Sequence, residues 1–224
     1  EQDKLGGTCL HRGCIPTKAL LHAGEVADTT REAARFGVKA DFHGVDLAAV
    51  LAYQDGVVNK MFRGLTGLVS SRGITVVNGH GRLTSPTSVE VDGETYEGAH
   101  LVLATGSAPS TLPGLQIDGR RVLTSDHALR LPQLPASAVV LGGGVIGVEF
   151  ASAWRSLGVD VTIVEALPRL LPTEEESSSG RLERAFRRRG IGFRTGVRFA
   201  SVEHTGTGVR VLLADDSTLD AEVL

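Results

Sequence analysis

Two cysteines are the residues of this chain with the clearest chemistry. Cys9 and Cys14 are the only cysteines among the 224 residues, and they lie in the segment GGTCLHRGCIPTK, directly before a helical pattern. Pro16 suits the first position of a helix, which places Cys14 beside the free amides and the positive end of that helix. Lys18 adds a cation in the first turn, and both features favour a thiolate. The pattern therefore predicts a redox-active dithiol.

Other interpretations of the cysteine pair explain less. A disulfide across so short a loop gains little loop-closure entropy, so stabilising the fold is a poor reason to have one. Two cysteines can also be unrelated buried thiols or half of a metal site. A zinc site needs further ligands, and none of the seven histidines falls at recognisable ligand spacing near the pair. The sequence favours redox chemistry and predicts no metal.

A glycine fingerprint of the form G-x-G-x-x-G is the second chemical motif. It follows the apolar strand predicted over 138–141 and opens the helix predicted over 145–157. A backbone without Cβ atoms lets a pyrophosphate approach the helix amides, whereas a merely glycine-rich turn is the alternative. The predicted dinucleotide site contains Gly142, Gly144, Val145, Ile146 and Gly147.

An acidic residue after the next strand indicates which dinucleotide binds. Glu165 follows Gly142 by 23 residues, close to the ~20-residue offset of the acid that binds the ribose hydroxyls. A carboxylate there accepts hydrogen bonds from the NAD diol and repels the 2′-phosphate of NADP, so NAD is favoured. Arg169, four residues later, leaves NADP open. Val197 is a further predicted cofactor-binding residue.

The elements that must position these residues fall into two groups. Helical spacing of apolar residues predicts helices over 16–36 and 45–71, ending at Gly37 and Gly73. Short antiparallel strands forming a small β-meander are expected at 74–77, 79–83, 88–91 and 94–97. A buried strand over 99–104 then enters the turn at 105–107.

The second group alternates strands with helices. Segments 138–141, 145–157, 161–164, 174–189 and 191–193 predict a β-α-β-α-β series of the Rossmann type, with 209–213 and 218–224 continuing it as further strands. The fold class expected is α/β with two nucleotide-binding, Rossmann-like domains. We place a partial FAD-binding domain over 1–122 and a partial NAD-binding domain over 123–224.

Composition excludes several functions. The net charge of −3 gives no general attraction to nucleic acid. No stretch approaches the ~18–20 uninterrupted apolar residues of a membrane span, and no export signal is visible at the start. We therefore expect a cytoplasmic protein without nucleic acid or membrane partners.

The dithiol segment resembles the redox-active stretch of the flavoprotein disulfide reductases, and CIPTKALL is most similar to the dihydrolipoamide dehydrogenases of that family. The resemblance implies that Cys9 exchanges with substrate and that Cys14 makes charge-transfer contact with the flavin. It also implies that Glu149 pairs with Lys18 where nicotinamide meets flavin. Glu149 at the start of its helix also has a purely structural interpretation. The FAD contacts implied are Thr8, Lys18, Gly81, Thr105, Gly106 and Ser107.

The same resemblance implies an activity and an assembly. The reaction is oxidation of dihydrolipoamide on lipoyl domains of 2-oxo acid dehydrogenase complexes or the glycine cleavage system, with FAD and NAD as cofactors. Family members carry an N-terminal FAD glycine loop and a C-terminal dimerisation domain, which provides a catalytic His–Glu pair to the other subunit of a homodimer. We expect this chain to be a segment of such a protein. Glutathione-type or mercuric reductases and a catalytically silent nucleotide-binding fragment are the alternatives.

Overall fold

The computed structural model describes residues 1–224 and divides into two compact units. Unit 1 contains residues 1–16 and 55–108, and unit 2 contains residues 17–54 and 109–224. These units are defined by contacts between residues of the chain, and such contacts do not show which unit binds which cofactor. The division into FAD- and NAD-binding domains at residue 122 therefore stays a prediction.

Unit 1 holds a short helix, part of a long helix and one sheet. Helix α1 spans Gly7–Arg12, and α3 spans Leu47–Ser71 and enters this unit at residue 55. The sheet is antiparallel in the order β1-β2-β3, and its second turn uses Asp92 and Gly93 at positive φ, as a tight hairpin requires. Its strands are β1 Arg82–Ser85, β2 Ser88–Val91 and β3 Glu94–Glu97. The predicted meander is confirmed for these three strands.

Two predicted strands of unit 1 are wrong. Segments 74–77 and 99–104 carry no strand, and the segment predicted over 79–83 forms one only from Arg82 onward. Ile74 is 58% exposed and Val102 is 89% exposed. Apolar β-branched residues predicted these strands, but a strand forms only where a neighbouring backbone pairs with it. No strand of the structure pairs with either segment.

Unit 2 begins with most of helix α2, which spans Cys14–Arg31 and starts in unit 1. A 3-10 turn over Ala33–Phe36 follows, closed by Gly37 at φ 74°, whose N–H donates to the carbonyls of Ala33 and Ala34. The helix predicted over 16–36 is therefore divided in two, although the glycine that ends it was predicted. Short helix α4 spans Ser125–Ala128.

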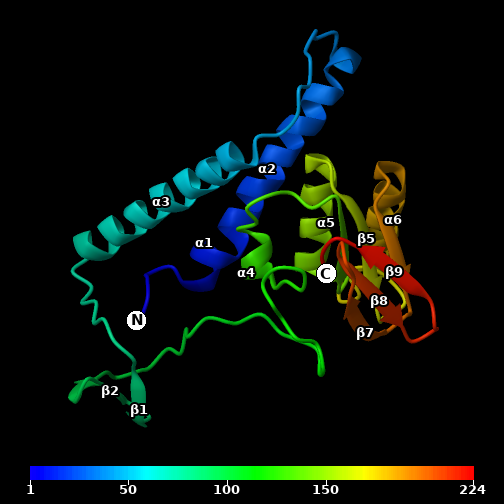
Figure 1. The fold of residues 1–224 in the computed structure, drawn as a ribbon. Helices are drawn as coiled ribbons and strands as arrows, with labels where there is room; N and C mark the ends of the chain where they lie inside the picture. The colour runs from blue at the N-terminus through cyan, green and yellow to red at the C-terminus, as the bar shows by residue number, and fades with distance from the viewer. The chain divides into compact units, whose positions relative to one another are not determined.

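A parallel sheet forms the centre of unit 2, and the predicted Rossmann-type series is confirmed (Figure 1). Its strands pair in the order β4-β5-β6, with Val140 beside Ile163 and Ile163 beside Phe193. The elements are β4 Ser137–Leu141, α5 Val145–Leu157, β5 Asp160–Glu165, α6 Glu176–Arg189 and β6 Gly192–Thr195.

The strands predicted over 209–213 and 218–224 do not continue this sheet, contrary to the prediction, and the strand before them was not predicted. Strands β7 Phe199–His204, β8 Val209–Leu213 and β9 Thr218–Ala221 form a separate antiparallel sheet. The reason is the short connections, since parallel neighbours need a long crossover and antiparallel ones need only a turn. After β9, Val223 bridges Ala138 of β4. Leu224 then exchanges backbone hydrogen bonds with Arg121 and Leu123, each 2.7 Å long.

Two hydrophobic cores cover the two faces of the parallel sheet. Ala138 and Ile163 belong to a core with α5 and α6, whereas their neighbours Val139 and Val164 belong to a core with β8. This alternation follows from the two-residue period of side chains along a strand. Leu20 of α2 is buried in the first core. No helix of the protein combines the length and apolarity needed to cross a membrane.

Asp118 organises the turn that leads into α4. Its Oδ1 accepts hydrogen bonds from the backbone N–H groups of Arg120, Arg121 and Val122 at 2.8, 2.8 and 2.9 Å. Burial raises the pKa of this carboxyl, but the three amides and His204 lower it by more, so the pKa lies below its ordinary value. The carboxylate therefore stabilises the fold where it is ionised.

We predict that Asp118→Asn removes a pH-dependent part of the stability. Because the folded pKa is depressed, the stabilisation is fully present above the unfolded value of about 3.9 and is lost as pH falls through the folded pKa. Urea unfolding of both proteins should show wild type more stable at pH 7, with the difference shrinking below about pH 4. A difference that stays constant over this range would contradict the role of the charge.

Candidate active site

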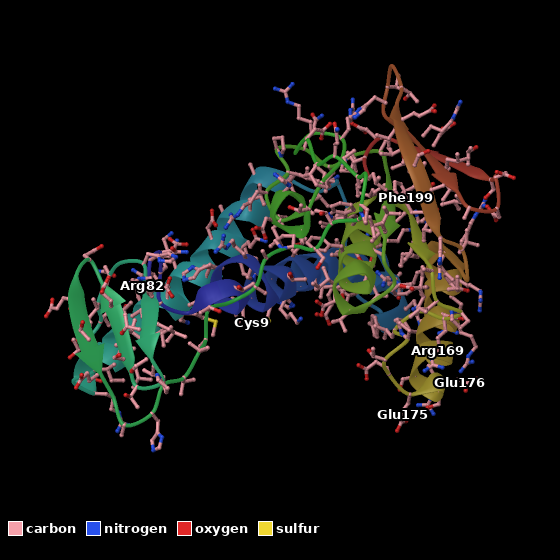
Figure 2. All side chains as sticks on the ribbon, turned by 90° about the horizontal axis from the view of Figure 1, so that it is seen from below. Cys9, Arg82, Arg169, Glu175, Glu176 and Phe199 are labelled. Carbon is pink, nitrogen blue, oxygen red and sulfur yellow. A yellow bond between two sulfur atoms is a disulfide. The ribbon has the colours of Figure 1, made fainter.

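The two cysteines form a disulfide that bridges α1 and α2. Cys9 lies in α1, Cys14 is the first residue of α2, and their Cα atoms are 4.7 Å apart. Both residues are exposed, and Figure 2 shows the sulfur of Cys9 at the surface of α1. Within this chain, no other residue buries the pair.

Helix α2 begins two residues earlier than predicted. Pro16 was expected at the first helical position, but the helix starts at Cys14 and Pro16 is its third residue. The missing N–H of proline is tolerated there because the first turn of a helix has no internal partners for its amides. Cys14 itself therefore occupies the helix start, where the dipole favours negative charge by about 0.3–1 kcal/mol.

Lys18 and Glu149 are brought together in unit 2. Lys18 lies one turn after Cys14 in α2, and its Nζ donates to Oε1 of Glu149 in α5 at 2.6 Å. The lysine side chain is 56% exposed and the glutamate side chain 23% exposed. The resemblance predicted this pair of residues, and their role beside the cofactors remains a prediction.

The predicted FAD contacts of unit 1 are partly assembled. Thr8 Oγ1 donates to the carbonyl of Ser107 at 3.3 Å and accepts from the Ser107 N–H at 3.1 Å. Gly106, at φ 77°, passes so close to Thr8 that a Cβ would lie 3.0 Å from the hydroxyl oxygen. Thr105 and Gly81 are exposed, and a Cβ at Gly81 would lie 3.1 Å from Cγ1 of Val89 in β2. Thr8 and the turn at 105–107 thus form one local structure.

The glycine loop offers a cradle without side chains. Gly142 has φ 105°, which an L side chain rarely adopts, and no side chain caps the first turn of α5. Open space surrounds the Cβ positions of Gly142 and Gly144, whereas a Cβ at Gly147 would overlap the Gly142 carbonyl oxygen. Val145 and Ile146 follow, exposed, in the first turn of the helix. The N–H groups of Gly142 and Gly143 donate to Val164 and Glu165, so the amides left to meet a pyrophosphate are those of the first turn of α5, where the helix dipole favours an anion.

Glu165 is held at this loop as the last residue of β5. Its Oε2 accepts from the Gly143 N–H at 2.6 Å and its Oε1 from the Leu167 N–H at 2.8 Å. Each carboxylate oxygen can accept a second hydrogen bond, so the two oxygens together could accept one from each of the two ribose hydroxyls. The Val197 N–H donates to the Glu165 carbonyl at 3.2 Å, so Val197 lies beside the acid through its backbone.

Gly143 is a site residue that the sequence analysis missed. Its N–H binds Glu165, its carbonyl accepts from the Leu171 N–H at 2.8 Å, and a Cβ would press on Leu170 and Glu165. The fingerprint leaves this position unspecified. The run of three consecutive glycines was the signal that could have identified it.

Arg169 does not face the ribose acid as a free cation. Its Nη2 donates to the carbonyls of Pro172 and Glu174, both at 3.0 Å, and Figure 2 shows the residue at the end of α6 where Glu175 and Glu176 lie. Its buried Nε has no hydrogen-bond partner. Arg169 thus stabilises the loop before α6. No group of three or more His, Cys, Asp or Glu side chains is placed to hold a metal ion.

Comparison with known proteins identifies the family. A family model of the pyridine nucleotide-disulphide oxidoreductases matches residues 3–224. The chain belongs to this family. Dihydrolipoyl dehydrogenase of Bacillus subtilis is 41% identical over 235 residues, covering 99% of this chain and 48% of that protein.

Solved structures of the family superpose on the whole chain. LpdA from Mycobacterium tuberculosis aligns with a TM-score of 0.85 and 31% identity, covering 100% of this chain and 50% of that one. The HOCl-induced flavoprotein disulfide reductase RclA from Escherichia coli aligns with a TM-score of 0.79 and 26% identity, covering 100% of this chain and 48% of that one. The chain spans about half the length of these relatives. The family uses FAD and NAD, and the α/β fold predicted from the sequence is confirmed.

We predict that Gly147→Ala weakens NADH binding by roughly tenfold or more, equivalent to about 1.4 kcal/mol. The new methyl overlaps the Gly142 carbonyl, so the loop must move away from the conformation that presents its amides. Calorimetric titration with NADH measures the change. Gly64→Ala is the matched control, because its Cβ would enter open space on α3, and it should leave the Kd unchanged.

Proposed function

We propose that this chain carries the dithiol and the nucleotide-binding residues of a dihydrolipoyl dehydrogenase, which oxidises dihydrolipoamide and reduces NAD. The observation that carries the proposal is the exposed Cys9–Cys14 disulfide at the start of α2. Lys18 of the same helix forms a hydrogen-bonded ion pair with Glu149. Similarity to dihydrolipoyl dehydrogenases over the whole chain supports it.

The proposed dithiol chemistry consists of two exchange steps. A substrate thiolate attacks Sγ of Cys9, the Cys9–Cys14 bond breaks, and its electron pair leaves on Sγ of Cys14. The second substrate thiolate then attacks the substrate sulfur of the mixed disulfide and releases Cys9. The substrate is thereby oxidised to a cyclic disulfide and the enzyme disulfide is reduced to a dithiol. The two protons that accompany reduction of the disulfide to a dithiol come from the two substrate thiols.

Other residues of the chain stabilise the Cys14 thiolate and orient the charge near it. The helix start stabilises the Cys14 thiolate, and Lys18 adds positive charge one turn later. Glu149 holds the lysine side chain in a defined direction. FAD and NAD, when bound, supply the redox chemistry that removes the two electrons from the dithiol.

NAD is the proposed acceptor rather than NADP. Glu165 presents a buried carboxylate beside the glycine loop, where a 2′-phosphate would be repelled. Arg169 was the residue that kept NADP as an alternative cofactor. Its guanidinium instead donates to two backbone carbonyls. Both observations support a diol-binding site.

The proposed partners are lipoyl domains of 2-oxo acid dehydrogenase complexes or of the glycine cleavage system. A homodimer in the cytoplasm is the proposed assembly and location. The support for these proposals is the similarity to dihydrolipoyl dehydrogenases. A NAD-reduction assay with free dihydrolipoamide and with a purified lipoyl domain tests the substrate. Turnover with glutathione or with mercuric ion alone would contradict it.

We predict different effects of serine at the two cysteines in the flavin-loaded protein. Cys9→Ser should keep a Cys14 thiolate and hence a long-wavelength charge-transfer absorbance, while lipoamide turnover is abolished. Cys14→Ser should lose both. Visible absorbance spectra and turnover measurements decide the assignment, and a long-wavelength band that survives in Cys14→Ser would show the roles to be reversed.

We predict that Glu165→Ala lowers the preference for NAD over NADP. Loss of the carboxylate removes two ribose acceptors and the repulsion of the 2′-phosphate. The ratio of kcat/KM for the two cofactors should fall by roughly ten- to a hundredfold, as expected for about 1.5–3 kcal/mol of hydrogen bonding to a charged group. Glu203→Ala, on β7, is a control that should leave the ratio unchanged.

A further inference from the structure

Helices α2 and α5 touch at a residue that has no side chain. A Cβ at Gly24 of α2 would lie 2.9 Å from Cβ of Ser156 and 3.5 Å from the carbonyl oxygen of Ala153, both in α5. The first of these distances is shorter than real Cβ contacts, so only glycine permits this approach. Glycine inside a helix costs about 0.8–1 kcal/mol relative to alanine. The chain therefore carries a local penalty at Gly24 that the close packing of the two helices explains.

A polar cluster fixes the same contact from the other side. Ser156 Oγ donates to Oδ2 of Asp28 in α2 at 2.6 Å, and Arg189 Nη2, from the end of α6, donates to Ser156 Oγ at 2.6 Å. Arg31 Nη1 donates to the Ser156 carbonyl at 2.6 Å. Leu20 of α2 adds apolar burial in the core beneath α5. Ser156 is thus the point on α5 against which α2 is seated.

The ion pair between Lys18 and Glu149 lies further toward the start of both helices. Gly24 follows Lys18 by six residues and Ser156 follows Glu149 by seven, which correspond to about 9 and 10.5 Å along the two helices. The two helices therefore contact each other at two points, Lys18 with Glu149 and Gly24 with Ser156, which are separated by similar distances along each helix. A half-exposed ion pair contributes only about 0–1 kcal/mol, so it does not hold the helices in register by itself.

From these contacts we infer that Gly24 is a positioning residue, which sets the distance between α2 and α5 so that Lys18 reaches Glu149. This inference deepens the proposed function and, for its effect on turnover, rests on it. A methyl at position 24 moves α2 away from α5 at Ser156. The separation reaches Lys18 less than two turns away on the same helix.

The experiment measures how fast the Lys18 amine is acetylated, with Lys60 of α3 as the internal reference. Quantitative mass spectrometry gives the ratio of the two rates in the flavin-loaded protein that carries this chain. Glu149→Gln defines the ratio when the pair is broken, which should be roughly two- to fivefold above wild type, the range for loss of an exposed ion pair. Gly24→Ala should raise the ratio toward that value and lower dihydrolipoamide-dependent NAD reduction.

Matched variants separate positioning from stability. Gly24→Ala combined with Ser156→Gly restores the space and should return the ratio toward wild type. Gly67→Ala, whose Cβ enters open space on α3, should not change it. Ser156→Thr keeps the hydroxyl and adds one methyl on the α5 side. It should raise the ratio in the same direction, and it serves as the test if Gly24→Ala does not fold.

The outcomes distinguish this inference from the proposed function. A wild-type acetylation ratio in both Gly24→Ala and Ser156→Thr, whatever their melting temperatures, overturns the positioning role. An elevated ratio that the space-restoring variant reverses supports it. If that pattern appears while wild type fails to oxidise dihydrolipoamide, the positioning of Lys18 stands and the proposed activity is wrong.

Discussion

The chain's passage from β4 into α5 is the constraint on which the rest of unit 2 depends. Gly147 sits against the Gly142 carbonyl so closely that no side chain fits, and Gly142 itself has positive φ. Gly143 is bonded through its N–H to Glu165 and through its carbonyl to Leu171. The loop, the end of β5 and the segment before α6 are therefore one connected structure, and the axis of α5 is fixed with them.

A fixed α5 presents functional groups on two sides. Its first turn faces the open space of the glycine loop, while Glu149 and Ser156 project toward α2. The dinucleotide site proposed at this loop relies on backbone dipoles, because the loop contains no lysine or arginine. Attraction by dipoles decreases faster with distance than attraction between charges, so an anionic cofactor is recognised by fit at the loop rather than by long-range steering. The overall charge of −3 agrees with this arrangement.

Local sequence patterns predicted the parts that depend on local rules. The helix over 145–157 was predicted with the bounds it has, because a glycine run precedes it and Gly158 ends it. The segments at 74–77 and 99–104 failed because the apolar pattern of a strand says nothing about whether a partner backbone is present. Gly24 was not identified because a glycine within a helical pattern carries no sign of the Ser156 across from it. The pairing of Lys18 with Glu149, 131 positions apart, came from family resemblance and not from spacing.

The backbone bonds of Leu224 have a consequence for the order in which the protein folds during synthesis. Arg121 and Leu123 are paired with Leu224, and Arg121 also binds Glu222, 101 positions later in the sequence. A ribosome adds about 5–20 residues per second, so the segment around residue 121 waits about 5–20 s for its partner to be made. Valine and leucine residues of the core shared with β8 remain without that cover for the same interval. The backbone pairing that closes this part of unit 2 therefore forms only after residue 224 has been added, so the final step of its folding depends on the last residues of that unit to be made.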